Sequence, residues 1–134
     1  MKKMLRRWIL LLVCLPLGCA ALSEKYKMEE YGRTLDTYET AMRVSSFNAV
    51  CQYVDPTVMS RQDCMQCYDN VKIANYNVLS AEVSEDQNEV DLTVEASYFL
   101  LDRYVVTKTQ FEQSWHYLEA SKRWMLKTPP PKFE

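Results

Sequence analysis

The 134-residue sequence predicts an α+β fold in which N-terminal helices pack on a curved four-stranded antiparallel sheet. Two features of the chain support this prediction. Apolar residues recur every three or four positions through much of the first half, which is typical of amphipathic helices. From residue 71 onward many of them recur at every second position, which is typical of half-buried strands. The length suffices for one small domain rather than two.

The first predicted helix covers residues 23–44. Ser23 is a suitable N-cap, and Glu24 follows in the first turn, where the helix dipole favours an acidic side chain. One face of this helix carries apolar side chains at i, i+4, i+7 and i+11: Tyr31, Leu35, Tyr38 and Met42. The opposite face is charged, so we expect the apolar stripe to face the sheet.

Two shorter helices are predicted between this helix and the sheet. Residues 47–54 carry apolar side chains at helical spacing. This helix ends at Asp55-Pro56, because the residue before a proline avoids the helical conformation. A third short helix is predicted within residues 57–68, and Asp69-Asn70 ends it.

Four strands are predicted to follow: 71–83, 90–96, 105–118 and 123–126. The connections between them are short, as a meander of hairpins requires: 84–88, 101–103 and 119–122. Residues 129–134 form a proline-rich tail, which cannot join the sheet because proline has no amide hydrogen to donate.

The N-terminus has the composition of a bacterial signal peptide. Four Lys and Arg side chains lie within the first seven residues, and ten mainly apolar residues, 8–17, follow. This apolar run is about half as long as a bilayer-spanning helix. It ends in "LPLGC" at residues 15–19, which resembles the lipobox of bacterial lipoproteins, although Pro16 stands where an aliphatic residue is usual.

The lipobox resemblance implies cleavage before Cys19 and acylation of that cysteine. Residues 1–18 are then the signal peptide, residues 19–22 a lipidated tether and residues 23–128 the folded domain. Several acyl chains at one position attach a protein to a bilayer more stably than one chain does. Ala20 stands where an aspartate favours retention in the inner membrane, which implies an outer-membrane lipoprotein that faces the periplasm.

The charge of the mature chain excludes some partners. Removal of residues 1–18 leaves 12 Lys and Arg against 18 Asp and Glu, a net charge of −6. An acidic domain without a basic patch argues against nucleic-acid binding. It also argues against electrostatic adhesion to anionic lipid, so the acylated Cys19 has to provide the attachment to the bilayer.

Three cysteines remain in the mature domain, and two of them form the C-x-x-C motif Cys64-Met65-Gln66-Cys67. A c-type haem site requires histidine at the next position, which is Tyr68. A zinc site requires four ligands, and a thioredoxin-like site requires a preceding strand. We therefore expect a structural disulfide from Cys51 to either Cys64 or Cys67, worth about 3 kcal/mol in the chain-entropy model, with one thiol left over.

The order of the elements resembles the NTF2-like (cone-shaped α+β) fold over about residues 24–128. The residues that carry the resemblance are the apolar helix stripe, the short second helix and "QSWHYLEASKRWMLKTPPP" at 113–131, which is similar to the closing hairpin of NTF2-like domains in small bacterial lipoproteins. A cystatin-like packing of one helix on four strands is the close alternative.

Some NTF2-like enzymes use carboxylates, histidine or tyrosine inside the cone, which implies Asp91, Glu95 and His116 as candidate pocket residues. Asp91 and Glu95 alternate with the apolar face of their strand, so we expect both to face solvent. A paired acid and base has to converge on one pocket, and the pattern does not predict such convergence. Most aromatic side chains, at helical and strand spacing, are predicted to form the core.

The sequence therefore favours a non-catalytic envelope lipoprotein that serves as an interaction or ligand-binding module. No catalytic residue, metal or cofactor is expected. The expected partners are the bilayer, through acylated Cys19, and an envelope protein or a small apolar ligand. A homodimer through the open sheet face is compatible with the resemblance. The alternative functions are a small cone-pocket enzyme of the isomerase or hydrolase type and a C-x-x-C thiol-disulfide protein.

Overall fold

The computed structural model describes residues 17–134, with side chains described from Leu22 onward. The predicted signal peptide lies almost entirely outside the described residues, and so does the side chain of Cys19. Among residues 17–134, no helix combines the length and the apolar character that crossing a bilayer requires.

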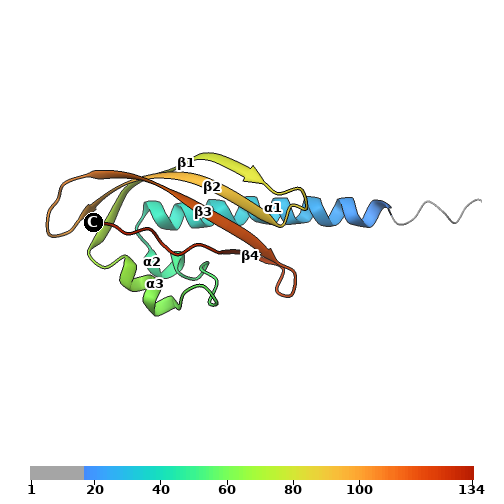
Figure 1. Ribbon diagram of the computed structural model, residues 1–134, viewed down its shortest axis with the longest axis horizontal. Helices are drawn as coiled ribbons and strands as arrows, with labels where there is room; N and C mark the ends of the chain where they lie inside the picture. Colours follow the sequence, from blue (N-terminus) through green and yellow to red (C-terminus); the bar gives the residue numbers. More distant parts are fainter. Residues whose placement is uncertain (1–16) are drawn as a thin grey trace, which may run out of the picture.

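Three helices are followed by four antiparallel strands, which confirms the α+β prediction (Figure 1). The strands form one open sheet in the order β1-β2-β3-β4, and α1 runs along one face of this sheet. The elements are α1 (Leu17–Arg43), α2 (Phe47–Val50), α3 (Arg61–Cys67), β1 (Val71–Val83), β2 (Glu89–Leu100), β3 (Thr107–Leu118) and β4 (Arg123–Leu126).

The apolar stripe of α1 packs on the sheet as predicted. Tyr38 and Met42 are almost fully buried, and Tyr31 is buried against the ring of Trp124, with the two ring centroids 5.2 Å apart. Tyr38 packs edge-to-face on Trp115 of β3, at a centroid distance of 5.0 Å. Strand β2 contributes every second side chain to the same core: Val90, Leu92, Val94, Ala96 and Tyr98.

Two irregularities of β1 change which side chains face the core. The pairing with β2 skips Ala74 and Leu79, as β-bulges do, so Tyr76 rather than Asn75 points inward. Val83 is 48 % exposed. It ends an edge strand and therefore has a neighbouring strand on one side only.

The second helix is shorter than predicted, because the chain turns at Cys51 and lies beside β4. Val54 forms a parallel bridge with Leu126, the amide of Asp55 donates to the carbonyl of Leu126 at 2.9 Å, and the amide of Leu126 donates to the carbonyl of Tyr53 at 2.7 Å. The segment 53–55 thus covers the outer edge of β4, and the helix that we predicted over 47–54 ends four residues early.

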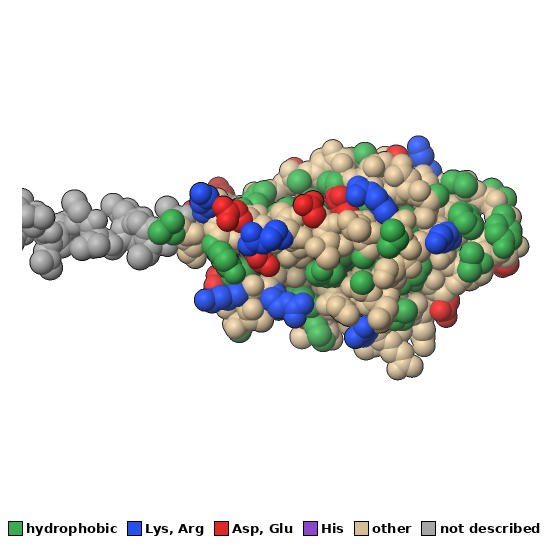
Figure 2. Space-filling view, turned by 180° about the vertical axis from the view of Figure 1, so that it is seen from behind, with side chains coloured by type: hydrophobic (Ala, Val, Ile, Leu, Met, Phe, Trp, Pro, Cys, Tyr) green, Lys and Arg blue, Asp and Glu red, His purple; other side chains and the backbone are tan. Residues whose placement is uncertain are grey.

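The proline-rich tail has no regular secondary structure, as predicted, but its end packs against the domain. The ring of Phe133 contacts those of Tyr68 and Tyr98 at 5.6 and 4.8 Å, and the hydroxyl of Tyr98 donates to the carbonyl of Glu134 at 2.9 Å. At the end of the molecule away from the N-terminus, Figure 2 shows hydrophobic side chains at the surface. The connection from β2 to β3 exposes four large apolar side chains, by 47 to 75 %: Leu101, Tyr104, Val105 and Val106.

Candidate functional site

The candidate pocket residues lie on the outer face of the sheet, opposite the core. Asp91 pairs with Ser114 across β2 and β3, and its carboxylate accepts a 2.6 Å hydrogen bond from the serine hydroxyl. Glu95 lies four positions after Asp91 on the same strand. Its carboxylate accepts a hydrogen bond from Gln110 at 3.3 Å and forms an ion pair with Lys108 at 3.4 Å. Both carboxylates therefore bind neighbours on the sheet surface.

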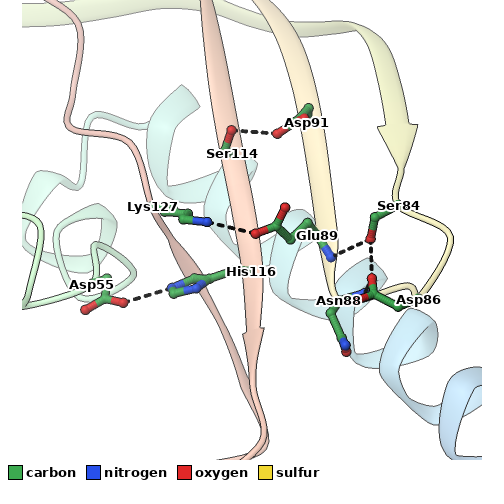
Figure 3. A network of polar contacts seen from close by, with 9 residues as sticks. All are labelled: Asp55, Ser84, Asp86, Asn88, Glu89, Asp91, Ser114, His116 and Lys127. Atoms are coloured by element: carbon green, nitrogen blue, oxygen red, sulfur yellow. Dashed lines mark hydrogen bonds and ion pairs between the residues drawn. The ribbon is translucent and has the colours of Figure 1, made fainter.

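His116 lies on the same outer face but contacts a residue from a distant loop (Figure 3). Its Nε2 atom is 2.8 Å from Oδ2 of Asp55, and the two side chains are 19 % and 8 % exposed. This separation is within hydrogen-bonding distance, and the contact ties the outer face of β3 to the loop between α2 and α3. Lys127 pairs with Glu89 at 2.8 Å beside it.

Asp55 is a structural residue that the sequence reasoning considered only as a helix end. Its Oδ1 atom accepts hydrogen bonds from the amide and the hydroxyl of Thr57, at 2.9 and 2.8 Å. These two hydrogen bonds, and then the contact with His116, hold the pKa of Asp55 below its usual range. The sequence Asp-Pro-Thr was a usable signal, because aspartate commonly accepts from the amide two residues later.

The structure thus brings Asp91, Glu95 and His116 to one face without bringing them together. Each binds a different group, and the outer face presents a row of separate polar pairs rather than a shared acid–base site. Within residues 17–134, no group of three or more His, Cys, Asp or Glu side chains is placed to hold a metal ion.

Gln113 is a second buried polar residue that the sequence reasoning did not single out. It alternates toward the core on β3, where its amide nitrogen donates to the hydroxyl of Tyr38 at 3.2 Å and its carbonyl accepts from the hydroxyl of Tyr76 at 2.9 Å. Burial raises the pKa of both tyrosines, so their hydroxyls remain protonated. The interior side of the sheet is therefore filled by a hydrogen-bonded aromatic cluster.

The disulfide joins Cys51 to Cys64, which is one of the two pairings that the sequence left open. The sulfur atoms are 2.05 Å apart, and the bridge ties the end of α2 to α3. Cys67 carries the remaining thiol, half-buried and 3.4 Å from the carbonyl of Asp63. The two cysteines of the C-x-x-C motif are consequently not bonded to each other.

A surface groove lies next to this bridge and has a positively charged lining. One hollow of about 200 Å³ is formed by α1, Tyr53 and the start of β4, and a second of about 310 Å³ by the segment from Cys51 to Arg61. Arg123 lines both hollows. We call the two together the arginine groove, because three arginines line it: Arg33, Arg61 and Arg123.

Lys27 marks the point where α1 first packs against the body of the domain. The residue is 8 % exposed, and its ammonium group donates to Oδ1 of Asn88 at 2.7 Å and lies 5.7 Å from the ring centroid of Tyr117. Its carbonyl accepts from the indole nitrogen of Trp124 at 2.9 Å. Residues 22–26 are all exposed, so the first turns of α1 stand clear of the sheet.

The comparison with solved structures finds a similar fold. Over 71 % of this chain and 72 % of the other, the structure is similar to the solution structure of a SEC-C motif containing protein from Rhodopseudomonas palustris, with a TM-score of 0.52 and 9 % sequence identity. No protein-family model matches the sequence, and neither does any curated protein. At this level of identity the likeness concerns the fold alone.

Proposed function

We propose that this chain is a lipoprotein of the bacterial envelope, anchored through acylated Cys19 and serving as a non-catalytic interaction module. The observation that carries the proposal is the sequence "LPLGC" at residues 15–19, directly after a cationic segment and a short apolar run. The position of Ala20 after the cysteine supports the outer membrane as its location, with the domain in the periplasm.

The geometry of α1 is compatible with an anchor at this position. The helix begins at Leu17, and the ten residues to Tyr26 extend for about 15 Å at 1.5 Å per residue. Because residues 22–26 are exposed, a stretch of exposed helix separates Cys19 from the packed domain. The exposed turns act as a short spacer between the bilayer and the domain.

The interaction function is supported by the contacts of the polar residues that an enzyme would use. Asp91, Glu95 and His116 each stabilise the sheet surface or a loop, and Gln113 satisfies two buried hydroxyls. We also propose that the fold is NTF2-like in its details. A long helix with an aromatic stripe, packed on the inner face of four meandering strands, supports that assignment over the cystatin-like alternative because two short helices follow the first.

Labelled palmitate supplied to bacteria that produce the chain tests the anchor. We expect the wild-type protein to incorporate label and the Cys19→Ala variant to incorporate none, because the acyl chains attach to that sulfur. The Cys67→Ala variant is the matched control, since it also removes one thiol but keeps the lipobox-like sequence. An unlabelled wild-type protein, or a labelled Cys19→Ala variant, would refute the proposal.

A further inference from the structure

We propose that the arginine groove binds an acidic, partly apolar peptide segment of a partner protein. The proposal rests on the interaction function given above, since it names the chemistry of the partner. Its test is separate, because binding is measured in solution and does not depend on the acyl anchor.

The charge of the groove contrasts with that of the whole domain. The chain from Cys19 onward has a net charge of −6, whereas the groove is lined by three arginines and by Glu30 as its single acidic side chain. The carboxylate of Glu30 is already bound by Arg33 at 2.7 Å. The groove therefore has a net positive charge before a ligand enters it.

Arg123 has donors available for a ligand. Arg61 binds the side chain of Asn48, but Arg123 has no side-chain hydrogen bond or ion pair with any residue in the described range 17–134. It begins β4 and lies where the two hollows meet. A guanidinium group can bind a carboxylate through two parallel hydrogen bonds, which makes it the expected central contact.

Two accessible apolar side chains in the second hollow favour a peptide over a free oxyanion. Pro56 and Met59 line this hollow and remain accessible, whereas Trp124 and Val54, which also line the groove, are buried. An extended peptide directs alternate side chains to opposite sides, at about 3.3 Å per residue. Acidic side chains on one side of such a peptide can meet the arginines while another part of the peptide contacts Pro56 and Met59, two contacts that phosphate alone cannot make together.

The walls of the groove are held in place before any ligand arrives. The Cys51–Cys64 bridge fixes one side of the second hollow, and the backbone bonds between residues 53–55 and β4 fix the ridge between the hollows. A rigid site binds a peptide more tightly because less conformational entropy is lost on binding. This assigns the bridge a role in shaping the groove.

Fluorescence anisotropy with a labelled peptide tests the proposal on the full chain in detergent solution. The probe is Glu-Leu-Glu-Leu-Glu, and Gln-Leu-Gln-Leu-Gln is its uncharged counterpart. We expect the acidic peptide to bind and the uncharged one to bind at least tenfold more weakly. Arg123→Gln should weaken binding of the acidic peptide at least tenfold, and added salt should weaken it further in the wild-type protein.

Arg103→Gln is the matched control, because it removes the same charge from the exposed connection between β2 and β3, which lines neither hollow of the groove. It should change the affinity less than twofold. Urea unfolding of both variants verifies that they remain folded, which we expect because both arginines are exposed. Equal loss in the two variants, no binding by the wild-type protein, or complete displacement of the peptide by an equal concentration of inorganic phosphate would overturn the proposal.

Discussion

Asp55 and Gln113 acquire their structural roles from residues that are distant in the sequence. Asp55 contacts His116 from 61 positions away, and Gln113 binds Tyr38 across 75 positions. Which residue each of them contacts depends on how the strands and loops pack together. The local spacing of apolar residues does not contain this information. The sequence located His116 and the tyrosines, but only the packed structure shows what each of them contacts.

Replacement of Asp55 by asparagine should lower the stability of the domain in a pH-dependent way. The folded pKa of Asp55 lies below the unfolded value of about 3.9, so its ionised form stabilises the folded state above that pH. This stabilisation is lost as the pH falls through the folded pKa. We expect Asp55→Asn to lower the free energy of unfolding by about 1 kcal/mol at pH 7, the difference between hydrogen bonds to charged and to neutral acceptors.

Urea unfolding at pH values from 7 down to 2.5 measures this effect. The gap between the wild-type protein and Asp55→Asn should narrow below about pH 4, because Asp55 becomes protonated in the wild-type protein as well. Asp36→Asn is the control, since Asp36 lies on the exposed face of α1. A gap of constant size across the pH range would show that the ionised carboxylate does not stabilise the fold.

The individual helices and strands follow the sequence pattern closely wherever one periodicity runs unbroken. Strand β1 has the predicted bounds, 71–83, and the stripe of α1 is buried as expected. The pattern was insufficient where tertiary contacts override local preference. The bulges of β1 belong to its pairing with β2, and the early end of α2 accompanies the bridge between Val54 and β4.

The disulfide is expected to stabilise the segment between α2 and α3. The bridge spans 13 positions, and the chain-entropy model assigns about 3 kcal/mol to a loop of this size. We expect the double variant Cys51→Ser/Cys64→Ser to lose about that amount in urea unfolding. Cys67→Ser should change stability by less than about 0.5 kcal/mol, because Cys67 makes only a weak hydrogen bond.

The two cysteine variants also test the pairing itself. If Cys51 were bonded to Cys67, the Cys67→Ser variant would lose as much stability as the double variant. Thermal unfolding with and without a reductant provides a second measurement. Reductant should lower the melting temperature of the wild-type protein and of Cys67→Ser, and it should leave the double variant unchanged.

At the scale of the whole molecule, the described residues form a packed domain preceded by an exposed stretch of α1, and the boundary between them is at Lys27. A chain that begins at Ser23 should unfold within about 0.5 kcal/mol of one that begins at residue 19 and carries Cys19→Ala, because residues 22–26 are exposed. Urea unfolding compares the two.

A chain that begins at residue 31 lacks Lys27. Its free energy of unfolding should be lower than that of the chain that begins at Ser23 by more than about 2 kcal/mol. The loss of Lys27 leaves Asn88 and the indole nitrogen of Trp124 without the partners that they have in the intact domain. If the two shortened chains had the same free energy of unfolding, Lys27 would not mark the start of the packed domain.

The sequence by itself determined the α+β class, the order of the elements, the bounds of β1 and β4, the apolar stripe of α1 and the two pairings open to Cys51. These properties depend on residues close together in the chain, whose spacing sets which face is apolar. Only the tertiary structure decided that Cys64 is the bonded partner, that Asp55 meets His116, and that three arginines from α1, α3 and β4 line one groove. Such contacts join residues from separate elements, and their distances depend on how those elements pack.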